Sequence, residues 1–72
     1  MKSIEELLFD RYGPLLSLNH LAEVLHRSPD GLRIALHEGS EYAAQLNAAK
    51  IRVGRRVYFR TPDVAQLFLA TP

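Results

Sequence analysis

Arginine side chains gather in the middle of this chain and are its clearest chemical feature. Residues 27–60 hold seven Lys and Arg against three Asp and Glu, a formal charge of +4, whereas residues 1–26 sum to −2 and residues 61–72 to −1. The planar guanidinium group binds phosphate through paired hydrogen bonds. Because the whole chain carries only +1, the pattern predicts one local cationic surface rather than a uniformly basic protein.

The other reactive residue types favour no catalytic or metal site. The chain has no cysteine, which excludes disulfides, thiolate zinc sites and thiol nucleophiles. His20, His26 and His37 are six and eleven residues apart and lack the i, i+4 pairing of a helical metal site. No glycine-rich phosphate loop or nucleophile–base pair is evident. We therefore expect neither an enzyme nor a protein that needs a metal or a cofactor.

Composition indicates one small globular domain over residues 1–72. Hydrophobic residues make up 47% of the chain and charged residues 24%, a balance typical of folded proteins rather than disordered ones. No apolar stretch has the length of a signal peptide or a membrane span. We expect a cytoplasmic protein without a membrane partner.

Caps and apolar spacing predict the elements that must position the arginines. Ser3 and Glu6 form a capping box for an N-terminal helix within residues 1–14. Leu15-Leu16 is expected to be a short extended link.

Residues 17–38 are predicted to form a helix-turn-helix. Ser17 caps its first helix. Ser28-Pro29-Asp30 opens the second, because a serine oxygen caps, proline suits the first helical position and aspartate favours the positive end of the helix dipole. Gly39 is a suitable residue for the C-terminal end of this second helix. The stripe expected to face the core is Leu32, Ala35 and Leu36.

Three further elements follow. Residues 41–48 are predicted to be helical, either as a separate segment or as an extension of the preceding helix. Residues 50–60 alternate apolar and basic side chains around Gly54-Arg55, which predicts a hairpin with a two-residue turn. Thr61-Pro62-Asp63 repeats the cap pattern and begins a C-terminal helix at 61–70.

This order of elements favours DNA as the ligand of the predicted cationic surface. A two-stranded hairpin is only marginally stable by itself and must pack against the helices. We therefore expect its turn to project beside the helix that begins at Ser28. Such a helix fits the major groove while the hairpin tip reaches phosphates or the neighbouring minor groove. We predict a mainly helical α+β fold, a winged helix-turn-helix with a two-stranded β-hairpin wing and a C-terminal helix, that binds double-stranded DNA. The residues expected to contact DNA are Arg27, Ser28, Asp30, Gly31, Arg33, Ile34, His37, Arg52, Arg55 and Arg56.

These charges also have plainer interpretations. Arg33 either reads a base or pairs on the helix surface with Asp30 or Glu38. Arg55 and Arg56 either contact DNA or keep an exposed strand edge soluble. Aromatic side chains that could stack on bases are expected to pack instead: Tyr42, Tyr58 and Phe59.

Three segments together resemble a known family. They are similar to the excisionase-like branch of the MerR-type winged helix-turn-helix proteins. The segments are residues 28–39, residues 53–59 and residues 61–69, the last running from Thr61-Pro62-Asp63-Val64 to Leu67-Phe68-Leu69. The chain departs from the family at Gly31, where a hydroxyl residue is common, at Ala35, where an aromatic is common, and in a longer stretch before the wing.

The resemblance implies DNA binding with a role in excision of a phage or mobile element, in which several copies line up on DNA beside an integrase. A small transcriptional regulator of such an element is the nearest alternative. An alternative of another class is an adaptor whose Leu- and Ala-rich helical faces dock a protein, with the arginines serving only solubility.

Overall fold

Serine N-caps begin four of the five helices in the computed structural model, which describes residues 1–70. In each cap the serine Oγ accepts a hydrogen bond from the backbone N–H three residues later, at 3.0–3.2 Å. The predicted capping box of Ser3 and Glu6 is confirmed. The helices are α1 (Ile4–Tyr12), α2 (Leu18–Val24), α3 (Pro29–His37), α4 (Glu41–Ala48) and α5 (Thr61–Ala70).

The turn between α2 and α3 fixes the angle at which α3 leaves α2. His26 adopts a left-handed conformation with φ 57°. Its N–H donates to the Glu23 carbonyl at 3.2 Å, and the Arg27 N–H donates to the Ala22 carbonyl at 2.9 Å. This pair of bonds is a Schellman motif, which satisfies the last carbonyls of α2 and redirects the chain.

Gly39 separates α3 from α4. It has φ 73°, the left-handed conformation that glycine adopts without steric cost. Ser40 follows in an extended conformation and caps the next helix. Residues 41–48 are therefore a helix of their own, which resolves the two predicted alternatives.

The sheet has three antiparallel strands within residues 1–70, in the order β1-β3-β2. The predicted hairpin is present as β2 (Lys50–Val53) and β3 (Arg56–Arg60), and Gly54 takes φ 61° in its turn. The prediction missed β1 (Leu15–Ser17), which was expected to be only a link and instead pairs Leu16 with Phe59. Pairing between residues this far apart leaves no trace in local periodicity.

The start of α5 is as predicted, but Thr61 also makes a long-range bond. Its hydroxyl is buried and donates to the Gly13 carbonyl at 2.7 Å, while its backbone N–H donates to the Pro14 carbonyl at 3.0 Å. These two bonds fasten α5 to the segment after α1. The threonine thus links distant parts of the chain in addition to marking a helix start.

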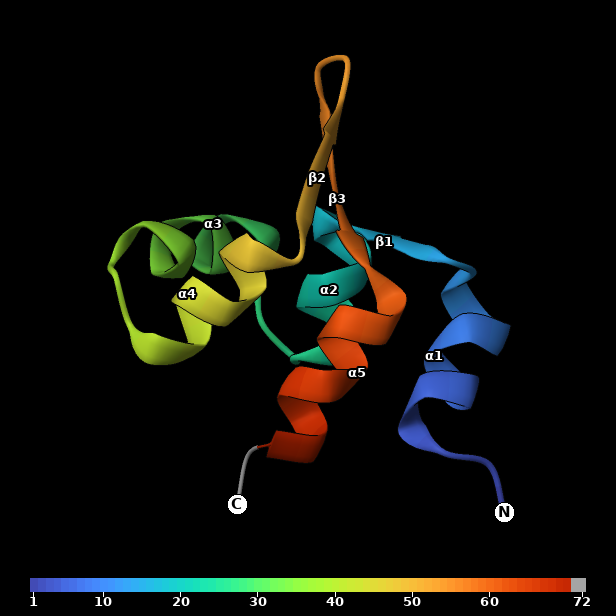
Figure 1. Ribbon diagram of the computed structural model, residues 1–72. Coiled ribbons are helices and arrows are strands. Elements are labelled where there is room, and N and C mark those ends of the chain that lie inside the picture. The colour runs from blue at the N-terminus through green and yellow to red at the C-terminus, as the bar shows by residue number, and fades with distance from the viewer. Residues whose placement is uncertain (71–72) are drawn as a thin grey trace.

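The elements enclose one hydrophobic cluster at the base of the sheet. It draws on α1, α2, α3, α4, α5, β1 and β3, and its fully buried large apolar side chains are Leu16, Leu21, Leu32, Leu46, Phe59 and Val64. Figure 1 shows that the β2–β3 hairpin rises out of this body beside α3, whereas α1, α5 and the N-terminus lie toward the opposite end. The fold is therefore a small, mainly helical α+β domain with a projecting hairpin.

Candidate nucleic-acid interface

The helix α3 turns one face to the core and the other to solvent. Leu32 and Ala35 are buried, and Leu36 is half-buried against the core, as the predicted stripe required. The opposite face is exposed and carries four of the predicted contact residues: Asp30, Arg33, Ile34 and His37. An α-helix of this size fits the major groove of B-DNA.

Arg33 and Asp30 form an ion pair on that exposed face. The Arg33 Nη1 donates to the Asp30 Oδ1 at 3.0 Å, and the two side chains remain 60% and 88% exposed. Exposed pairs of this kind contribute about 0.5 kcal/mol or less. The pairing that was the plainer interpretation is therefore present, yet it costs little to rearrange.

Ser28 and Gly31 have a structural role at the start of α3. The Gly31 N–H donates to the Ser28 Oγ at 3.0 Å. A Cβ built on Gly31 would lie 2.9 Å from that same oxygen, so a larger residue here would make the serine side chain shift. Ser28 thus sets where α3 begins.

Arg27 precedes α3 and reaches across to α4. Its Nη1 donates to the Tyr42 hydroxyl at 3.0 Å, so the charge is held in the turn between α2 and α3 without neutralisation. Tyr42 itself packs partly buried against the core, as expected of an aromatic that packs rather than stacks on a base.

The two faces of the hairpin carry different arginines. Cross-strand pairs place Lys50 beside Phe59 and Arg52 beside Val57, and side chains of paired residues lie on the same face of a sheet. Arg56 pairs with Val53 and lies on the other face. The predicted group of hairpin arginines is therefore divided between two faces, with Arg55 in the turn between them.

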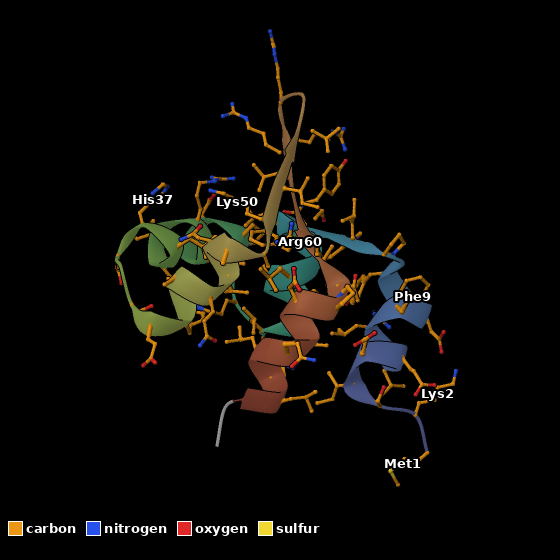
Figure 2. The ribbon with its side chains drawn as sticks, viewed as in Figure 1. Met1, Lys2, Phe9, His37, Lys50 and Arg60 are labelled. Carbon is orange, nitrogen blue, oxygen red and sulfur yellow. The ribbon has the colours of Figure 1, made fainter. Side chains whose placement is uncertain are left out.

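A cleft of ≈ 230 Å³ joins the first of these hairpin faces to α3. Its walls come from α2, α3, α4 and both strands of the hairpin: Leu18, Arg33, Leu36, His37, Asn47, Lys50, Val57 and Phe59. In Figure 2, His37 and Lys50 lie on the same upper side of the molecule, Lys50 nearer the base of the hairpin and His37 farther out on α3, while Met1 and Lys2 lie at the other end. The exposed face of α3 and the Lys50 face of the hairpin thus border one surface.

Lys50 was not among the residues expected at the site. It is exposed and lines the cleft together with His37. Its alternation with Arg52 along the strand was visible in the sequence and would have placed both on one face. Only the packing of the hairpin on α3 shows which face that is.

Apart from Arg33, which pairs with Asp30, most cations of this region lack acidic partners. Elsewhere the structure pairs Lys2 with Asp10, Arg11 with Glu23 and Arg60 with Asp63. Within residues 1–70, five cations form no ion pair: Arg27, Lys50, Arg52, Arg55 and Arg56. All five are exposed and belong to the turn before α3 or to the hairpin.

Two of the paired cations support the fold instead. Hydrogen bonds from Arg11 and Tyr12 tie α1 to α2 and lower the pKa of Glu23. Arg60 bonds Asp63 in α5, and its Nη2 donates to the Ala48 carbonyl at 2.8 Å. Neither arginine is available to a polyanion without breaking these contacts.

The described residues offer neither a metal site nor a membrane-spanning helix. No three His, Asp or Glu side chains of residues 1–70 cluster closely enough to hold a metal ion. None of the described helices combines the length and the apolar character needed to cross a membrane.

Comparison with known proteins gave no assignment. The chain matches no family model, no curated protein and no solved structure. Its resemblance to excisionase-like proteins therefore stays a prediction from the sequence.

Proposed function

We propose that this chain is a winged helix-turn-helix protein that binds double-stranded DNA sequence-specifically. In this proposal α3 enters the major groove, and the β2–β3 hairpin is the wing that contacts the sugar–phosphate backbone or the neighbouring minor groove. No cofactor is required. The observation that carries the proposal is that the cations without an ion pair lie on the hairpin and before α3. One of them, Lys50, lines the same cleft as Arg33 and His37 of the exposed α3 face.

The dimensions of the two elements fit the two grooves. The major groove is about 12 Å wide and admits one α-helix. From Lys50 to Val53 the hairpin extends by about 10 Å at the usual rise of a strand, which carries Gly54 and Arg55 beyond the body of the domain (Figure 1). A duplex with α3 in its major groove would meet this tip at the adjacent backbone.

The Arg33–Asp30 pair leaves Arg33 able to read a base. The pair is exposed and contributes about 0.5 kcal/mol or less, so the guanidinium can turn toward a base edge at little cost. Arginine reads guanine through two parallel hydrogen bonds in the major groove, and Arg33 is exposed on the α3 side of the cleft. We therefore assign base reading to Arg33 and backbone contact to the hairpin cations.

Within DNA binding, we infer an excisionase or recombination directionality factor, which would act with an integrase. This assignment depends on the sequence resemblance of residues 15–69 alone. Excision requires that the DNA be bent, so circularly permuted duplexes should migrate anomalously when the protein is bound. A transcriptional regulator need not produce this change.

Salt dependence tests the proposal. Each phosphate neutralised by a cation releases condensed counterions and contributes about −0.9 to the slope of log affinity against log salt. With most of the five unpaired cations engaged, we expect a slope of about −4 and an affinity loss of roughly two to three orders of magnitude between 50 and 200 mM salt. Fluorescence anisotropy of a labelled duplex measures both. A flat response, or no binding, would favour the protein-docking adaptor.

A further inference from the structure

Ile34 is a large apolar side chain exposed on α3. Ile34 is 61% exposed, whereas Leu32 and Ala35 on the core side of the same helix are 0% and 7% exposed. A single exposed aliphatic residue is common on protein surfaces and needs no explanation by itself. The position of Ile34 is what requires one, because it lies among polar residues on the face of α3 that points away from the core.

The neighbours of Ile34 leave it open to a ligand. By helical spacing it shares the exposed face of α3 with Asp30 and His37, four residues before and three after. Gly31, three residues before, has no side chain to cover it. The core side of α3 faces α2 and α4, and Ile34 is not among the apolar side chains of residues 1–70 that pack on the core.

The other exposed large apolar side chains of residues 1–70 lie elsewhere. Val53 is on the hairpin, and the rest belong to the N-terminal segment and α5: Met1, Ile4, Leu7, Phe9 and Leu69. Ile34 is thus the apolar group of this kind that α3 would carry into a groove.

We infer that Ile34 packs on the C5-methyl group of a thymine in the major groove and selects a T·A pair at one position of the site. This inference rests on the proposed function. The thymine methyl is the apolar group that base edges offer in the major groove. A polar base edge facing Ile34 would instead lose water without gaining a hydrogen bond.

Replacement of thymine by deoxyuridine tests the inference, because it removes only the methyl group. A preferred duplex is first selected from a randomised pool, and each thymine in it is then replaced singly. Burial of one methyl-sized group corresponds to about a fourfold change in affinity. We expect this loss at one thymine for the unmodified protein, and no loss at that position for Ile34→Ala.

Two further variants sharpen the result. Val53→Ala removes an exposed aliphatic side chain from the hairpin and should keep the fourfold effect at the same thymine. Ile34→Val shortens the side chain by one methylene and should retain part of the effect. Circular dichroism confirms that each variant is folded.

The outcomes separate this inference from the proposed function. If a duplex is selected but every deoxyuridine replacement is neutral, or Ile34→Ala keeps the sensitivity, the thymine contact is wrong and DNA binding stands. If no duplex is selected, both fail. Coupling between Ile34 and one thymine methyl, measured as a double-mutant cycle, would establish the contact.

Discussion

Replacing Arg52 and Arg55 together by alanine is expected to weaken duplex binding roughly a hundredfold at 0.1 M salt and to flatten the salt slope by about two. Both side chains are exposed and unpaired, one on the α3-facing side of the hairpin and one in its turn. Each lost phosphate contact removes close to one power of ten at this salt concentration, through the counterions it no longer releases. Anisotropy titrations at several salt concentrations measure both quantities.

Two matched variants show whether position or charge is responsible. Lys2→Ala removes one positive charge at the opposite end of the molecule (Figure 2) and should leave affinity unchanged. Arg56→Ala removes one from the other face of the hairpin and should cost less than Arg52→Ala. Equal losses for Lys2→Ala and Arg52→Ala would mean that net charge, and not a local surface, determines binding.

Phe59→Ala is expected to remove most of the stability of the domain. Phe59 is fully buried on β3, between Leu16 of β1 and Lys50 of β2 in the sheet. Truncation of a buried phenylalanine costs about 3–5 kcal/mol, and a domain of this size is stable by only about 4–11 kcal/mol. Urea denaturation followed by circular dichroism measures the change.

Phe9 provides the matched control for this truncation. It is 51% exposed on α1, so Phe9→Ala loses little buried area and should change the free energy of unfolding by less than about 1 kcal/mol. Comparable losses for Phe9→Ala and Phe59→Ala would contradict the placement of the core at the base of the sheet.

Local chemistry was sufficient to predict most of the fold. Serine caps and glycines act within a few residues, so Ser3, Ser17 and Ser28 marked helix starts, and Gly39 marked a helix end. The alternation from residue 50 to 60 gave the hairpin for the same reason. What the sequence concealed was long-range pairing: β1 has three residues, too few for a periodic signal.

The candidate site was predictable in composition but less so in arrangement. The i, i+3 spacing already allowed the Arg33–Asp30 pair that the structure contains. The predicted two-residue turn already implies that Arg52 and Arg56 lie on different faces of the hairpin. Which face meets α3 depends on packing, so only the structure places Lys50 with His37 at one cleft.

The most direct test of a single DNA-binding surface is an NMR titration of the isotope-labelled protein with duplex DNA. We expect amide shift changes in residues 27–38 and 50–57, with α1 and α5 unaffected. Shift changes confined to α1 and α5, or to only one of the two predicted segments, would contradict a single DNA-binding surface.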